Sequence, residues 1–169
     1  MSNPRITIGL SNPKSPTNVG AVLRAAGCFQ ADEIFYTGNR YERAAAFCTD
    51  TQNLVNTIPL IGVGCLLESA PADAKIVVVE LAENAISLAE FQHPENAFYI
   101  FGPEDGTVKK NIVQQADSVV YIPTKGCLNL AATVNVVLYD RLAKTHQREE
   151  GNELIRQSRD VNNRLVVKL

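Results

Sequence analysis

The chain has 169 residues, 46% of them hydrophobic and 20% charged, which are the proportions of a globular domain. We expect residues 1–169 to form one domain with a polar tail from about residue 145. The start of the chain has no signal-peptide pattern and the longest apolar stretches are strand-sized, which predicts a cytoplasmic protein without membrane spans.

The first part of the chain alternates strand and helix patterns. A strand is expected at residues 5–10, and the Ser-Asn-Pro and Ser-Pro turn signals of residues 11–16 end it. A helix capped by Thr17 or Asn18 then runs to about Phe29. The next elements are expected at 33–37 (a strand), 39–56 (one or two short helices) and 62–69 (a helix).

The second part contains the clearest strand, at residues 75–81, because Ile76-Val77-Val78-Val79 is apolar on both faces, as in a central parallel strand. The remaining elements are expected at 87–91 (a short helix), 97–101 (a strand), 109–115 (a helix), 118–122 (a strand) and about 129–144 (a long helix). Alternating strands and helices predict an α/β fold with a mostly parallel sheet flanked by helices.

The net charge of −2 hides an uneven distribution. Lys and Arg outnumber acids five to three in residues 1–43 and seven to five in 139–169, whereas residues 44–138 hold four against ten. The basic residues at the two ends form either a patch that attracts phosphates or ordinary solvated surface.

The cysteines and histidines are too scattered to hold a metal. Cys28, Cys48, Cys65 and Cys127 form no CxxC pair and have no histidine at ligand spacing, so no metal site is expected. We expect reduced, buried thiols, as in a cytoplasmic protein. His93 and His146 are both expected on the surface.

Three loops that follow predicted strands have an unusual composition, and ligands of such sheets bind beyond the carboxyl ends of strands. They are residues 11–24, residues 101–106 (Phe-Gly-Pro-Glu-Asp-Gly) and residues 122–129 (Ile-Pro-Thr-Lys-Gly-Cys-Leu-Asn). The fingerprints GxGxxG, GxxxxGK[ST] and GxSxG are absent, which disfavours a dinucleotide-dependent oxidoreductase, a phosphate-loop NTPase and a serine hydrolase.

Together these loops resemble the three motifs of the SpoU/TrmH family of SPOUT RNA methyltransferases. The matching residues are Asn18-x-Gly20-x-x-x-Arg24, Phe101-Gly102-x-Glu104, and Ile122-Pro123 followed by Leu128-Asn129. The resemblance covers roughly residues 5–143. The chain departs from the pattern at Cys127, where many relatives have Ser, and at Thr124, where they often have Met.

The resemblance implies a C-terminal trefoil knot that forms a pocket for S-adenosylmethionine. It also implies a homodimer with the active site at the subunit boundary. The cofactor-binding residues implied are Val79, Glu80, Leu81, Phe101, Gly102, Gly106, Ile122, Pro123, Cys127 and Leu128. The long helix is apolar nearly all round and must be buried, either in a dimer interface or at the centre of a monomer.

The activity implied is methyl transfer to RNA, most simply to a ribose 2′-hydroxyl, with tRNA favoured over rRNA. The catalytic residues implied are Arg24, Asn18, Glu104 and Asn129. A guanidinium keeps its charge in proteins, so we favour Arg24 as a group that stabilises a developing alkoxide or grips a phosphate, rather than as a base. Base methylation and a non-catalytic RNA-binding role remain as alternatives.

Overall fold

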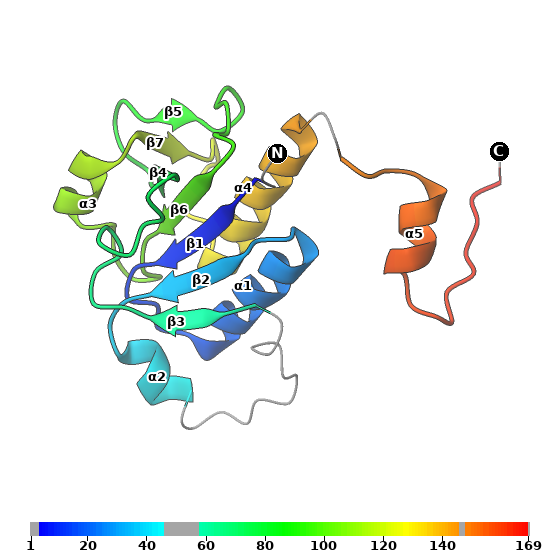
Figure 1. Ribbon diagram of the computed structural model, residues 1–169, viewed down its shortest axis with the longest axis horizontal. Helices are drawn as coiled ribbons and strands as arrows, with labels where there is room; N and C mark the ends of the chain where they lie inside the picture. Colours follow the sequence, from blue (N-terminus) through cyan, green and yellow to red (C-terminus); the bar gives the residue numbers. More distant parts are fainter. Residues whose placement is uncertain (1–3, 46–57, 146–147, 169) are drawn as a thin grey trace.

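A seven-stranded parallel sheet forms the centre of the protein (Figure 1). The structure is a computed structural model that describes residues 4–45, 58–145 and 148–168. The strands are β1 (Ile6–Leu10), β2 (Glu33–Tyr36), β3 (Leu60–Gly62), β4 (Lys75–Val79), β5 (Ile86–Ser87), β6 (Ala97–Phe101) and β7 (Ser118–Tyr121). Their order across the sheet is β3-β2-β1-β6-β4-β7-β5, and each neighbouring pair is parallel.

Helices cover both faces of this sheet. The helices of the described residues are α1 (Pro16–Cys28), α2 (Arg40–Ala45), α3 (Lys110–Gln115), α4 (Leu130–Lys144) and α5 (Asn152–Ser158). Helices α1 and α4 pack on one face, where alternate residues of β6, such as Tyr99, join the larger apolar core. Phe98 and Ile100 point to the other face, where they pack with Ile112 of α3. The alternation of side chains along each strand therefore buries both faces, as an α/β fold requires.

The predicted α/β class is confirmed, and most elements lie within two residues of their expected ends. Helix α1 starts earlier than expected: the Ser15 hydroxyl accepts from the Asn18 backbone N–H at 3.3 Å, with Pro16 in the first turn. Ser15 is therefore the N-cap, and the expected cap at Thr17 or Asn18 is wrong. The side chain of Asn18 is thereby left available for another contact.

Two expected helices are not formed. At residues 62–69 there is the end of β3 and then one turn, closed by the Ser69 N–H on the Cys65 carbonyl at 3.2 Å. Gly62 and Gly64 disfavour helix there, and pairing of β3 with β2 satisfies the backbone instead. Residues 87–91 likewise contain the end of β5 and a single turn.

Of the expected helices in residues 39–56, α2 is present, and residues 46–57 lie outside the described part of the chain. The tail holds one helix the sequence analysis missed, α5, and lies away from the sheet in Figure 1. Cys28 and Cys127 are exposed and Cys65 is half-buried, so the expectation of buried thiols is wrong for these three. Cys48 lies outside the described residues. No helix in the described ranges is long and apolar enough to cross a bilayer.

Of the two alternatives for α4, burial at the centre of a monomer is wrong, and burial in a dimer interface stays a prediction. The inner side chains of α4, such as Val134 and Val137, are fully buried against the sheet and α1. On the opposite side, Val136, Tyr139 and Leu142 are 38%, 63% and 40% exposed. An apolar face of α4 is therefore open to solvent in the single chain.

Of the two histidines predicted to lie on the surface, His146 falls outside the described residues, and His93 has a buried side chain that is only 5% exposed. The prediction for His93 is therefore wrong. Its Nδ1 lies 2.6 Å from the Tyr99 hydroxyl and its Nε2 lies 2.8 Å from Asp140 Oδ2. The sequence analysis missed the contact with Asp140 of α4, because residues 93 and 140 are far apart in the chain.

This burial gives a pH-dependent contribution to stability. Burial lowers the pKa of His93 below its ordinary 6.5; the hydrogen bond and charge of Asp140 oppose this, while the charges of Arg141 and Lys144 add to it. The folded protein therefore binds the proton less tightly than the unfolded chain. Stability from this residue is present above pH 6.5 and is lost as the pH falls below it.

We expect the free energy of unfolding, measured with urea, to fall between about pH 7 and about pH 5.5. This fall should be smaller in His93→Gln than in the wild type. An equal fall in His93→Gln and the wild type would contradict a neutral buried His93.

Candidate active site

Loops after four adjacent strands meet at one edge of the sheet. Strands β1, β6, β4 and β7 are neighbours and parallel, so their carboxyl ends lie side by side. The loops that follow β1, β6 and β7 are the three motif loops of the sequence analysis. The fold therefore brings together segments that are about 90 and 110 residues apart in the chain, at the edge where α/β sheets bind ligands.

Glu104 joins the loop after β6 to the loop after β1. Its carboxylate accepts the backbone N–H of Lys14 at 2.9 Å and of Ser15 at 3.0 Å, and the Asn18 side-chain amide at 3.2 Å. Partial burial alone would raise the pKa of Glu104, but the hydrogen bonds from Ser15, its own backbone, Asn18 and Lys14 lower it below the ordinary value. Glu104 is thus held as a carboxylate at the N-terminus of α1, where negative charge is favoured.

Glu80 joins the end of β4 to the far side of the same loop. One carboxylate oxygen accepts the Val108 N–H at 2.9 Å, and the other accepts the backbone N–H of Leu81 at 2.9 Å. A Cβ at Gly102 would lie 3.3 Å from Glu80 Oε2 and from the Val108 backbone nitrogen. A glycine at 102 therefore allows the loops after β4 and β6 to pack closely.

The loop after β7 is a tight turn. Thr124 Oγ1 donates to the Gly126 carbonyl at 2.8 Å, and Gly126 has a φ of +104°, in the region that favours glycine. Asn129 then caps α4, because its side-chain oxygen accepts the Ala132 N–H at 2.7 Å. Thr124, a departure from the family pattern, thus closes the turn.

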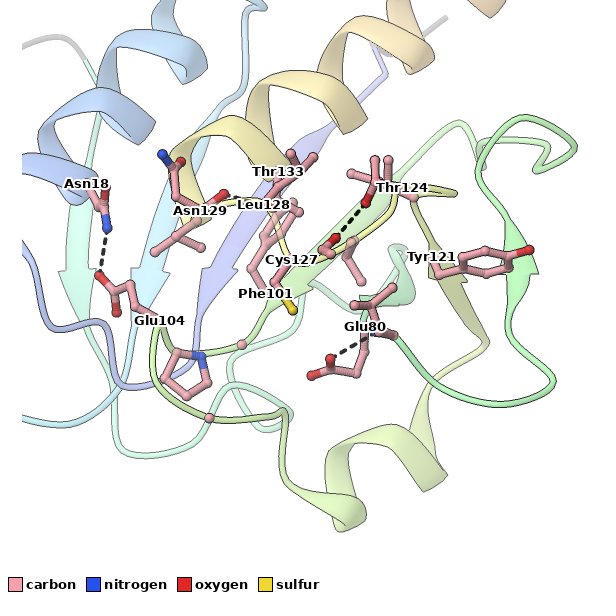
Figure 2. Close-up of a pocket in the computed structure, with 18 residues that line it drawn as sticks. Asn18, Glu80, Phe101, Glu104, Tyr121, Thr124, Cys127, Leu128, Asn129 and Thr133 are labelled. Carbon is pink, nitrogen blue, oxygen red and sulfur yellow. Dashed lines mark hydrogen bonds between the residues drawn. The ribbon is translucent and has the colours of Figure 1, made fainter.

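These loops enclose a cavity of about 260 Å³ (Figure 2). Figure 2 shows Asn18 and Glu104 at one end of the cavity and Tyr121 at the other. Apolar side chains line much of it, and Leu81 and Leu128 are 53% and 40% exposed. An apolar, partly open cavity with two carboxylates at its wall has the character of a small-molecule site.

Most of the residues expected in the site line this cavity. They are Asn18, Val79, Glu80, Leu81, Phe101, Gly102, Glu104, Gly106, Ile122, Cys127, Leu128 and Asn129. Pro123 and Arg24 do not line it. Arg24 lies two turns along α1 from the first residue of that helix and is exposed.

The sequence analysis missed six residues of the cavity wall. They are Pro103, Tyr121, Thr124, Gly126, Leu130 and Thr133. Three of these lie inside the motif loops, so the loops themselves were the available signal. Thr133 follows Asn129 by four residues, and helical spacing from the motif residue predicts that it faces the same way.

A cavity at the carboxyl edge of a parallel sheet, enclosed by loops from neighbouring strands, defines an α/β protein that binds a small ligand. The profile of the SpoU rRNA Methylase family matches residues 5–139, and the chain belongs to this family. The family resemblance drawn from the motif loops is therefore confirmed. A comparison with curated proteins found no match.

Solved structures share the fold at low sequence identity. The SpoU methyltransferase AviRb from Streptomyces viridochromogenes, in complex with AdoMet, has a TM-score of 0.69 at 17% identity over 88% of this chain. The TrmH/SpoU tRNA modifying enzyme of A. aeolicus has a TM-score of 0.70 at 21% identity, covering 82% of this chain and 76% of that one. The chain spans only 61% of AviRb.

A third structure, which concerns the 2-OH methylation of C/U34 on tRNA, is similar to this chain over most of both lengths. Its TM-score is 0.66 at 22% identity, and the match covers 85% of this chain and 92% of that one. At such identities these structures establish the shared fold and not the reaction.

Proposed function

We propose that this protein transfers a methyl group from S-adenosylmethionine to an RNA ribose 2′-hydroxyl, with tRNA favoured over rRNA. One observation carries the proposal: the three motif loops of a SpoU family member enclose a single cavity, with Asn18 and Glu104 bonded to each other at one end of it. AviRb in complex with AdoMet, and the structure concerned with 2-OH methylation of tRNA, have the same fold.

The residues present fit this cofactor. The cavity offers the exposed apolar side chains of Leu81 and Leu128 to an adenine ring. Backbone groups at Gly102, Ile122 and Leu128 would hold the nucleoside part, and the carboxylates of Glu80 and Glu104 set a negative potential that suits a cation. Cys127 is tolerable in place of Ser if the backbone does the binding. When bound, the cofactor would supply a methyl group on a positively charged sulfur.

The residues of this chain have the task of aligning and activating the RNA hydroxyl. Asn18 and Glu104 hold the loop after β1 against the cavity wall, and Asn129 fixes the start of α4. Arg24 carries its charge on the exposed side of α1, outside the cavity. We assign it to the RNA, as the donor that stabilises the developing alkoxide or grips the adjacent phosphate.

A homodimer and a C-terminal knot belong to this proposal as expectations. The open apolar face of α4, formed by Val136, Tyr139 and Leu142, supports burial against a second copy. Sedimentation analysis of the purified protein tests the dimer. A cytoplasmic location is compatible with an RNA substrate.

The experiment that tests the function compares modified nucleosides, by mass spectrometry, in tRNA and rRNA from cells with and without this protein. Loss of one 2′-O-methylated nucleoside from tRNA is the expected result. Loss of a base-methylated nucleoside instead would overturn ribose as the acceptor. Failure of the purified protein to bind S-adenosylmethionine in calorimetry would point to a non-catalytic RNA-binding role.

A further inference from the structure

Arg40 lies outside the three motif loops and yet bonds to two of them. It is the first residue of α2, directly after the loop that follows β2. Its Nη1 donates to both carboxylate oxygens of Asp105 at 2.8 Å, and its Nη2 donates to the Asn12 backbone carbonyl at 2.6 Å. Asp105 belongs to the loop after β6, and Asn12 belongs to the loop after β1.

The surroundings of Arg40 are built to keep this bridge. Asn12 has a φ of +47° and Gly38 a φ of +77°, and a Cβ at Gly38 would lie 2.1 Å from Asn12 Oδ1. Only glycine fits at 38, so the loops after β1 and β2 touch directly. The Arg40 side chain is 30% exposed, and its Nε is buried without a hydrogen-bond partner among the described residues. A buried nitrogen without a hydrogen bond destabilises the fold, so the hydrogen bonds of Nη1 and Nη2 are kept in spite of this cost.

The pKa of Asp105 is lowered by its contact with Arg40. The side-chain hydrogen bond from Arg40 is the main cause of a lowered pKa for Asp105, and the charges of Arg40 and Lys14 lower it further. Lys14 Nζ lies 3.8 Å from Asp105 Oδ2, beyond a hydrogen bond. The contact between the two loops at Asp105 thus depends on the fork of Arg40, which a lysine cannot reproduce.

We infer that Arg40 is a positioning residue for the proposed methyl transfer, which holds the cofactor-side loop after β6 in register with the RNA-side loop after β1. The inference rests on the proposed function. Glu104, next to Asp105, bonds to the same loop after β1. Arg40 therefore fastens Asp105 to the loop after β1, next to the bonds of Glu104, whereas the Ser11 N–H bonds to the Phe101 carbonyl at 2.9 Å where both loops begin. Loss of Arg40 leaves Asp105 with only the longer ion pair to Lys14, so this end of the loop after β6 can shift.

The test compares Arg40→Ala, Arg40→Lys and Asp105→Ala with the wild type in calorimetry with S-adenosylmethionine and in single-turnover methyl transfer to tRNA. A misplacement of about 1 Å between reacting groups costs on the order of a hundredfold in rate, so we expect a fall of that order in Arg40→Ala. The Kd for S-adenosylmethionine should rise about tenfold, and hydrogen exchange in residues 102–108 should become faster. Arg40→Lys should recover only part of the rate, because one amine cannot hold both partners.

Lys75→Ala is the matched control. It removes an exposed ion pair, Lys75 with Asp117 at 3.0 Å, at the start of β4 and so at the opposite edge of the sheet. Only Arg40→Ala should slow transfer, and the thermal midpoints of both variants show whether a loss of stability accounts for the difference. Adding Asp105→Ala to Arg40→Ala should cost little more than either alone.

Equal transfer rates and Kd values in Arg40→Ala and Lys75→Ala would overturn the inference, as would additive effects of Arg40→Ala and Asp105→Ala. A wild-type protein that binds no S-adenosylmethionine would instead overturn the proposed function. Faster exchange in residues 102–108 of Arg40→Ala can be measured in either case, so the two failures are distinguishable.

Discussion

Replacing Arg24 with alanine is expected to reduce methyl transfer to RNA by about a hundredfold to a thousandfold, the cost of removing one donor from a developing oxyanion. Binding of S-adenosylmethionine should be unchanged, because Arg24 does not line the cavity. Folding should also be unchanged, because the side chain is exposed on α1. Single-turnover transfer and calorimetric titration on the same preparation measure the two effects separately.

Arg43→Ala, which removes an exposed charge from α2, is the control for a general loss of positive charge. Arg24→Lys divides the two roles open to Arg24: a phosphate contact tolerates lysine better than a directed bond to an oxyanion does. A loss confined to RNA affinity would favour the phosphate contact. Unchanged turnover in Arg24→Ala would refute any part for this residue in the reaction.

Replacing Glu104 with glutamine is expected to weaken cofactor binding and to lower the free energy of unfolding. The new amide nitrogen would face an N–H donor of Lys14 or Ser15, which leaves a half-buried donor unsatisfied. Losing hydrogen bonds to a charged group of this kind costs about 1–3 kcal/mol of unfolding free energy. The Kd for S-adenosylmethionine should rise about tenfold or more, since the displaced loop carries Gly102 and Gly106 of the cavity wall.

The pH dependence supplies a second measurement. Because the pKa of Glu104 is lowered on folding, its contribution is present above the ordinary value of 4.5 and is lost as the pH falls through the folded value. The wild type should lose this part of its stability in urea unfolding below about pH 4.5, and Glu104→Gln should lack it. The exposed Glu90→Gln serves as control; identical unfolding of Glu104→Gln and this control would contradict the role of Glu104 as a link between loops.

Much of the fold could be predicted because it depends on local patterns. The run Ile76–Val79 is apolar on both faces, and β4 is indeed central in the sheet. The predicted strand at residues 97–101 coincides with β6. The site could be predicted for a related reason. Its loops directly follow strands, so their order in the sequence identifies one edge of the sheet.

Other features depend on contacts between distant segments, and the sequence alone could not indicate them. His93, beside a proline, was predicted to lie on the surface, but the fold buries its side chain between Tyr99 and Asp140. Arg40 bonds to partners that lie 28 and 65 residues away in the chain, which no local sequence pattern indicates. The apolar composition of α4 left two alternatives for its burial, because composition indicates that a face is apolar and not what covers it; the structure excludes the centre of a monomer.

The sequence by itself thus determined the α/β class, the family and the loops that form the cavity, because each of these depends on short-range patterns of apolar residues, glycines and turns. The tertiary structure decided which side chains in those loops meet. It showed that the side chain of Asn18 bonds to Glu104 instead of capping α1, and that Arg24 lies outside the cavity that its motif helps to build. Such pairings depend on strand order, which places residues about 90 positions apart within hydrogen-bonding distance.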